Sequence, residues 1–291
     1  RKCKVPMKPS VEVVLRKLEP TEEQHEAVKD FPYRQLTGLI AFPTCHTKLE
    51  ARYAISVISR FLNDRWTQEC VDALLDLLAY MLWSHDVGIM YSRGLDQHGT
   101  NTLYSFADSA FSEPRSQGAR MVKMNGAMIS FSSKRHTTTD TSTTSAELTE
   151  AFQASNDVCG FRNMMSELGF NVDAPTRIWQ DCMPAIQVAE GERNMTANTR
   201  HMSLRIWKIR ERLDMQQIEL AWCSTRDQQA DFGTKSLLTR PFVYLRDNAN
   251  GYALVRLFYP ERPMPAAVIS YAELIQTLDE FDKIDRNKKG K

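Results

Sequence analysis

The chain has 291 residues, enough for one or two domains with their own hydrophobic cores. Its 42% hydrophobic and 25% charged residues are typical of a soluble globular protein, no apolar run reaches the ~18 residues of a membrane helix, and a net charge of +1 excludes no class of partner. The 6 cysteines are scattered without a Cys-x-x-Cys pair, which predicts reduced thiols in an intracellular protein of the cytoplasm or nucleus, away from membranes.

The first part of the chain has the pattern of a helical unit behind a polar lead-in. Residues 1–30 contain three prolines among many charges, so we expect an extended segment with little core of its own. Apolar residues recur at helical spacing over 33–62, and 67–84 has the clearest amphipathic pattern. We therefore expect a helical unit over 31–95, followed by a second domain over 96–248.

The second domain is expected to begin with three strands and a helix. Leu103–Asp108 resembles a strand that ends in a carboxylate, and Asn125-Gly126 lies between two apolar runs. An Asn-Gly pair favours a hairpin because both central residues of a type I′ turn need positive φ. A helix then opens at Thr144–Ala151, which can bring Glu147 close to Asp108.

Two more carboxylates follow along the chain. Arg177–Asp181 resembles another strand that ends in an acid, and Asp231 lies in a polar segment that leads into a helix. Gathered carboxylates raise one another's pKa, so four of them need a counter-charge. A pair of divalent cations would supply it.

Six motifs resemble the RNase H region of copia-type LTR retrotransposon polyproteins, in order and in spacing. They are Arg115-Ser116-Gln117-Gly118, Ile129–Lys134, Ser145-Ala146-Glu147, Gln180-Asp181, Arg200-His201 and Gln229–Lys235. The resemblance covers roughly residues 33–245 and implies a mixed α/β fold. We expect an RNase H-like five-stranded mixed sheet with flanking helices, preceded by the helical unit.

The resemblance also implies an activity and a cofactor. Asp108, Glu147, Asp181 and Asp231 would hold two Mg²⁺ ions, for which Mn²⁺ can substitute, and the RNA strand of an RNA–DNA hybrid would be cut. Pro32–Gly38 resembles the end of the family's reverse transcriptase, so the helical unit would correspond to its thumb or connection. The sequence contains no Tyr-x-Asp-Asp turn, so we expect no polymerase activity and a possible partnership with a separate palm or a larger assembly.

Asp108 and Glu147 each have a structural alternative. A carboxylate that closes a strand is commonly a turn residue, which would account for Asp108. Thr144-x-x-Glu147 is itself a capping box, with Ser145 as an alternative cap. Glu150, one turn further along, is expected to be a solvated face residue.

The other two acids have alternatives as well. Asp181 could cap the helix that contains Pro184, and Asp231 could be a surface acid. Cys182 stands where the family usually has Asn, which removes a polar neighbour of Asp181 and argues for weakened activity. The loop before Asp231 contains no histidine, so we expect no histidine-assisted proton transfer from it.

Basic residues that could contact the phosphates of a hybrid gather in two places. A predicted helix carries Arg205, Lys208 and Arg212 along one face, beside an apolar stripe. The other candidates are Lys134, Arg135 and Arg200. A solvated basic face is the ordinary explanation of such a pattern, and His201 could equally be a packed or capping residue.

The C-terminal extension, 249–291, is expected to contain a strand, a helix that opens at Ser270 and a basic tail, and it suggests no function. A rival to the nuclease hypothesis is a catalytically degenerate or domesticated copy that serves as a nucleic-acid-binding or structural subunit. A third hypothesis is a general nucleic-acid-binding module that uses the basic helix. Metal-dependent cleavage would distinguish the nuclease from both of the other hypotheses.

Overall fold

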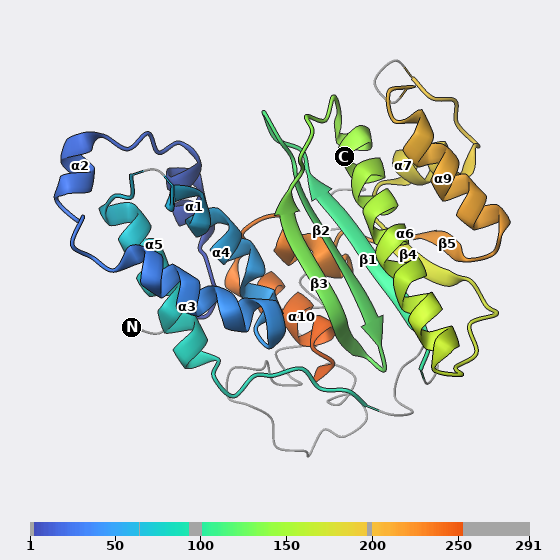
Figure 1. The fold of residues 1–291 in the computed structure, drawn as a ribbon, viewed down its shortest axis with the longest axis horizontal. Helices are drawn as coiled ribbons and strands as arrows, with labels where there is room; N and C mark the ends of the chain where they lie inside the picture. The colour runs from blue at the N-terminus through green and yellow to red at the C-terminus, as the bar shows by residue number, and fades with distance from the viewer. Residues whose placement is uncertain (1–2, 64, 93–100, 197–199, 253–291) are drawn as a thin grey trace, which may run out of the picture. The chain divides into compact units, whose positions relative to one another are not determined.

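The computed structural model describes residues 3–63, 65–92, 101–196 and 200–252. The chain divides into two compact units (Figure 1): 3–89 with 235–247, and 90–234 with 248–252. Among the described residues, no helix is long and apolar enough to cross a membrane. The strand, helix and basic tail expected near the C-terminus lie outside the described residues, apart from the first few residues of the extension.

The first unit is helical, as the apolar spacing predicts. Its elements are α1 (Pro9–Arg16), α2 (Glu22–Glu26), α3 (Tyr33–His46), α4 (Arg52–Ile58), α5 (Gln68–Trp83) and most of α10 (Thr239–Ala249), with short 3₁₀ turns at Leu49–Ala51 and Ser59–Phe61. The core includes the fully buried side chains of Tyr33, Ile58 and Leu77. The Tyr33 hydroxyl donates to the Ile58 carbonyl over 2.9 Å, which ties α3 to the end of α4.

The N-terminal segment differs from the expected extended lead-in. Pro9 occupies a first-turn position of α1, where its missing N–H costs nothing, and Leu15 is buried. The charges of the segment find partners inside the unit, since Glu12 accepts a 2.6 Å hydrogen bond from the Tyr53 hydroxyl. A segment that looks too polar to pack is therefore part of the helical core.

Helix α10 lies in a different unit from the one expected, because the sequence analysis places residues 96–248 in the second domain. Residues 235–247 belong to the first unit, where Phe242 packs edge-on against Tyr80 with ring centroids 5.8 Å apart. Arg246 is fully buried and donates to Asp247 over 2.8 Å. Its charge is thus neutralised inside the unit.

The second unit contains the five-stranded mixed sheet with flanking helices that the sequence analysis expects. The strands are β1 (Leu103–Ala110), β2 (Gln117–Met124), β3 (Ala127–Arg135), β4 (Thr176–Gln180) and β5 (Ile218–Trp222). Their order is β3-β2-β1-β4-β5, with the first three antiparallel and β4 parallel to both β1 and β5. The β2–β3 hairpin is confirmed as well, because Asn125 and Gly126 have φ of 53° and 85°.

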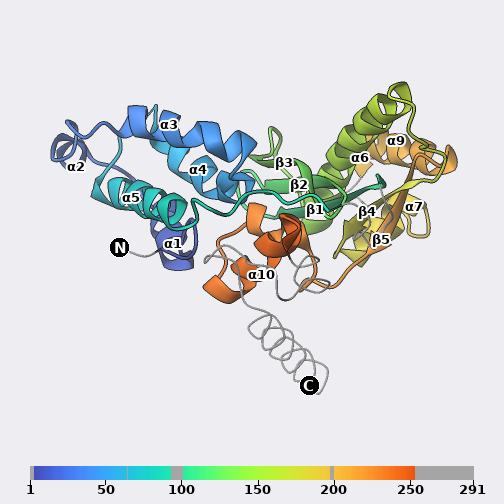
Figure 2. The same cartoon turned by 90° about the horizontal axis from the view of Figure 1, so that it is seen from below.

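Three helices cover one face of this sheet. The long helix α6 (Thr143–Glu167) packs on β1 and β2, and α7 (Met183–Glu190) and α9 (Ser203–Asp214) pack beside it (Figure 2). Leu148, Ile178 and Ile206 are fully buried in the shared core. The 3₁₀ turn η3 (Gln229–Gly233) packs on β1 and β2 against the opposite face, where a Cβ at Gly233 would come within 2.6 Å of Ala119.

Candidate metal centre

Three carboxylates meet where two parallel strands end. Asp108 lies near the end of β1, Asp181 follows the last residue of β4, and Glu147 lies in the second turn of α6. Neighbouring parallel strands end at the same edge of a sheet, which brings the two aspartates together. One oxygen from each of the three carboxylates lies within 4.8 Å of the others.

Asp108 is a buried group held by a neighbouring hydroxyl. Its exposed fraction is 5%, and its Oδ2 accepts a 2.6 Å hydrogen bond from Thr234 at the end of η3. Asp108 also pairs with Ala119 in mid-ladder, so the carboxylate does not belong to a turn. The turn interpretation of Asp108 is therefore wrong.

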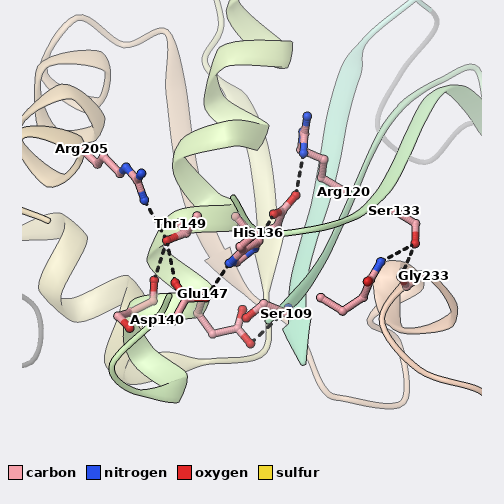
Figure 3. A network of polar contacts seen from close by, with 12 residues as sticks. Ser109, Arg120, Ser133, His136, Asp140, Glu147, Thr149, Arg205 and Gly233 are labelled. Atoms are coloured by element: carbon pink, nitrogen blue, oxygen red, sulfur yellow. Dashed lines mark hydrogen bonds and ion pairs between the residues drawn. The ribbon is translucent and has the colours of Figure 1, made fainter. Parts of the chain in front are cut away.

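Glu147 does not cap α6, although the Thr144-x-x-Glu147 motif is compatible with a capping box. The cap of α6 is Ser142, whose side chain accepts from the Ser145 N–H while Ser145 returns the contact to the cap N–H. The alternative interpretation of Thr144 and Glu147 as a capping box is therefore wrong, and the Glu147 side chain points toward the end of β1 instead (Figure 3). The Ser109 N–H donates to its Oε1 over 3.4 Å, and Oε2 is buried without a hydrogen-bond partner.

The cluster is electrostatically unfavourable by itself. Burial first, and then the charges of Asp108 and Asp181, raise the pKa of Glu147 well above its ordinary value. A buried carboxylate oxygen with no donor costs free energy unless a cation or proton satisfies it. Oxygen ligands around such a vacant acceptor fit the preference of Mg²⁺ and Mn²⁺, so the three residues suit a hard divalent cation.

Asp181 is the most accessible member of the cluster. The Thr225 hydroxyl donates to its Oδ2 over 3.0 Å, and the Trp222 indole donates to its backbone carbonyl over 3.2 Å. The N-cap of α7 is Cys182, which makes no side-chain capping hydrogen bond, so the alternative interpretation of Asp181 as the cap is wrong. Burial, followed by Glu147 and Asp181, raises the pKa of the Cys182 thiol to about 11, which keeps it neutral beside the acids.

Asp231 lies close to this cluster without joining it. It is buried in η3, with an exposed fraction of 5%, so the surface-acid interpretation is wrong. Gln228 holds the turn beside β1 through a 2.9 Å hydrogen bond to the Ala107 carbonyl. The pKa of Cys223 is raised to about 12 by burial and by four acids that include Asp108, Asp181 and Asp231, which places Asp231 in the same neighbourhood.

A second polar network, which no local sequence motif predicts, lies one turn along α6. Glu150, expected in solvent, has an exposed fraction of only 2% and accepts from Arg120 over 2.8 Å. His136 bridges Glu150 and Asp140, and Figure 3 labels His136, Asp140 and Arg120 of this network. The only local signal was the His136–Asp140 spacing of four residues in a polar loop, because the other partners are distant in sequence.

The predicted phosphate-binding residues fall into two groups. Arg205 donates to Thr149 over 3.1 Å, and Arg212 donates to Ser155 and Asn156, so both arginines fasten α9 to α6. Lys208 is exposed and pairs with its helix neighbour Glu211. The remaining candidates, Lys134, Arg135, Arg200 and His201, are exposed.

Among these exposed residues, Arg135 and Lys134 lie on opposite faces of β3. Arg135 follows Ser133 by two positions, and Ser133 shares its face of the sheet with Asp108 through Ala119. Arg135 therefore lies on the sheet face of Asp108, whereas Lys134 projects from the other face.

Comparison with known proteins gives distant relatives. No family model matches the chain. The chain is 24% identical over 214 residues to the retrovirus-related Pol polyprotein from transposon RE1 of Arabidopsis thaliana, which covers 72% of this chain and 14% of that protein. It is 23% identical over 232 residues to the Pol polyprotein from transposon TNT 1-94 of Nicotiana tabacum, with coverage of 78% and 17%.

Among solved structures, LC11-RNase H1 in complex with an RNA/DNA hybrid aligns with a TM-score of 0.37 and 13% identity, over 45% of this chain and 91% of that chain. The alignments with the two transposon polyproteins cover 14% and 17% of those proteins, so the chain spans less than a fifth of their length. Over 72–78% of its own length, it is distantly similar to copia-type Pol polyproteins.

Proposed function

We propose that the second unit is a metal-dependent ribonuclease H that hydrolyses the RNA strand of RNA–DNA hybrids. The observation that carries the proposal is the cluster of Asp108, Glu147 and Asp181, in which ligand oxygens from three separate elements lie within 4.8 Å of one another. The unsatisfied Oε2 of Glu147 supports a cation among them. The distant similarity to Pol polyproteins supports a role in nucleic-acid processing.

Each acid would contribute differently to the site. Asp108 and Glu147 are buried and would hold the cations, with Thr234 fixing the carboxylate of Asp108. Asp181 is half-buried and would face the substrate side, where Thr225 orients it. Bound Mg²⁺ or Mn²⁺ would supply an activated water and stabilisation of the departing oxygen. Asp231 would enter as the fourth, peripheral ligand.

The proposed substrate class rests on the acids and on exposed basic residues of the same unit. Arg135, on the sheet face of Asp108, and Arg200, ahead of α9, are exposed and would contact phosphates, which fixes register without reading sequence. Arg205 and Arg212 each donate to residues of α6, so they would offer a hybrid only their remaining N–H groups. Recognition of a hybrid through its groove and 2′-hydroxyls predicts slight sequence preference.

The decisive experiment is cleavage of an end-labelled RNA–DNA hybrid by the full chain in Mg²⁺. Asp108→Asn should lower the rate at least about a thousandfold, equivalent to ~4 kcal/mol in the barrier, and EDTA should abolish cleavage. Asp173→Asn, a change at an exposed acid that precedes the start of β4, whereas Asp181 follows the other end of that strand, should leave the rate unchanged. Folded protein that leaves the hybrid intact in both Mg²⁺ and Mn²⁺ would overturn the proposal.

A second candidate is a non-catalytic module that binds nucleic acid or supports a larger assembly. The observation in its favour is that Asp231 lies outside the three-carboxylate group, and Cys182 adds no polar contact to Asp181. Hybrid binding that persists in EDTA without any cleavage in Mg²⁺ would favour this module over the nuclease.

A further inference from the structure

The His136 side chain connects the loop after β3 to helix α6. Its Nδ1 lies 2.7 Å from Asp140 Oδ2, and its Nε2 lies 3.1 Å from Glu150 Oε2. All three side chains are buried. Asp140 precedes the Ser142 cap of α6, whereas Glu150 belongs to the second turn of the helix. One imidazole therefore bridges the approach to the helix and the helix itself.

Further contacts fix both ends of this bridge. Arg120 on β2 donates to Glu150 over 2.8 Å and to Asp157 over 2.6 Å, which anchors the acid to the sheet. At the other end, the Thr149 hydroxyl lies 3.2 Å from Asp140 Oδ1 and 2.9 Å from the Ser145 carbonyl, to which a hydroxyl can also donate. The loop, the first turns of α6 and β2 are thus joined through a single polar network.

The network occupies the space where a side chain at position 118 would lie, so it requires glycine there. A Cβ at Gly118 would come within 2.0 Å of Glu150 Oε2 and 2.5 Å of His136 Nε2. Contacts that short force a displacement, and here both groups are held by other bonds. Position 118 therefore offers a way to move the His136–Glu150 pair without removing either charge.

The candidate metal ligand Glu147 lies between the two residues that His136 contacts, Asp140 before α6 and Glu150 within it. Its own side chain has one long hydrogen bond, from Ser109, so its position depends on how the helix backbone is held. Glu150 follows it by three residues and Asp140 precedes it by seven, and His136 joins these two. Gln180 provides the other support, through a 3.2 Å bond to the Glu147 carbonyl.

We propose that His136 is a positioning residue for the metal centre, which holds the start of α6 so that Glu147 reaches Asp108 and Asp181. The proposal rests on the proposed function, because it assumes that Asp108, Glu147 and Asp181 form a metal centre. His136 itself touches neither the three carboxylates nor the space between them. Its effect is transmitted through Asp140, Glu150 and the helix backbone.

The charge state of the bridge agrees with its geometry. Burial by itself lowers the pKa of His136, but the hydrogen bonds to Asp140 and Glu150 outweigh burial and raise that pKa to about 9. The imidazole is therefore a cation at neutral pH and donates from both nitrogens. The other charged groups around it are Arg120 and Asp157 on the Glu150 side and Arg205 beyond Thr149.

The experiment uses the full chain with two different changes to the network and one matched control. His136→Ala removes the bridge, and Gly118→Ala displaces it. Arg210→Ala removes an arginine that ties α9 to α7 through the carbonyls of Ala189 and Val188, away from the network. The readouts are Mg²⁺ binding by calorimetry, amide hydrogen exchange over 140–148, and kcat and KM on a hybrid.

Both network variants should weaken Mg²⁺ binding about 10-fold or more and lower kcat similarly, with KM for the hybrid within about twofold, and should speed exchange over 140–148. Arg210→Ala should lower the melting temperature without those changes. Unchanged Mg²⁺ affinity and exchange in either folded network variant would overturn the proposal.

The outcomes also separate this proposal from the proposed function. A wild-type chain that binds Mg²⁺ but leaves the hybrid intact would end the nuclease reading, while the affinities of the variants would still decide the role of His136. Should the wild-type chain bind no Mg²⁺, the metal-centre proposal fails, and His136 no longer has a site to position. Exchange over 140–148 would then report only a structural bridge.

Discussion

Two glutamates three residues apart on one helix differ in the charges that surround them. Glu147 and Glu150 are both almost fully buried in α6. Glu150 is matched by Arg120 and His136, whereas Glu147 faces Asp108 and Asp181 and keeps one oxygen without a hydrogen-bond partner. Burial, together with these two neighbouring acids, raises the pKa of Glu147. A buried acid with its counter-charges supplied by the chain is structural, and one surrounded by like charges indicates a ligand that the chain itself does not supply.

The largest expected effect on stability comes from the matched acid. Glu150→Ala would leave the buried charges of Arg120 and His136 each without one of their two carboxylate partners, so it should lower the free energy of unfolding by about 3 kcal/mol or more. Urea unfolding at pH 7 measures the change. Glu167→Ala, at the exposed end of the same helix, should cost less than about 0.5 kcal/mol. Equal costs for the two variants would mean that the contacts of Glu150 with Arg120 and His136 do not stabilise the fold.

A smaller effect is expected from pH. The folded pKa of His136 is raised above its ordinary value of 6.5 to about 9, so its stabilising contribution is complete below about pH 6.5 and is lost as pH rises through 9. The free energy of unfolding of the wild-type chain should therefore fall relative to that of His136→Ala over this interval, by on the order of 2 kcal/mol. A difference between the two chains that stays constant from pH 6 to pH 9.5 would contradict the cationic bridge.

The smallest expected change in the free energy of unfolding is an increase, at Glu147. Glu147→Gln removes a charge whose folded pKa is raised by burial and by two neighbouring acids, so without metal it should stabilise the fold by about 1 kcal/mol. For the wild-type chain, stability without metal should fall as pH rises from about 4.5 toward the folded pKa, and the variant should lose this dependence. Thermal unfolding in EDTA, with Glu167→Gln as the control, tests both. Destabilisation by Glu147→Gln would mean that Glu147 is satisfied as it stands.

The sequence predicted the sheet and three acids of the site because their signals are local. The Asn125-Gly126 turn defines the hairpin, and strands that end in carboxylates identify Asp108 and Asp181. The resemblance to copia-type polyproteins selected Glu147 over its capping role, which local sequence favoured. Asp231 was predicted as a fourth ligand, and this role remains a proposal.

The parts that the sequence did not predict depend on contacts between distant positions. Glu150 was taken for a solvated residue because its partner Arg120 lies 30 residues away. The sequence of α9 shows its basic face but not that Arg205 donates to Thr149, 56 residues away. Likewise, the charges of α1 conceal its packing, because Glu12 finds Tyr53 only after folding. Local pattern reports which side chains are polar, and tertiary pairing determines which of them remain available.

The close approach at Gly118 constrains how this molecule can change by mutation. A methyl group at this position collides with the carboxylate of Glu150 and the imidazole of His136, so any larger residue becomes tolerable only after one of those two has been replaced by something smaller. Substitutions at the three positions should therefore be strongly non-additive, and the order in which they arise should matter. A lineage that lost the pair first could vary freely at position 118, whereas one that kept the pair would have to retain glycine.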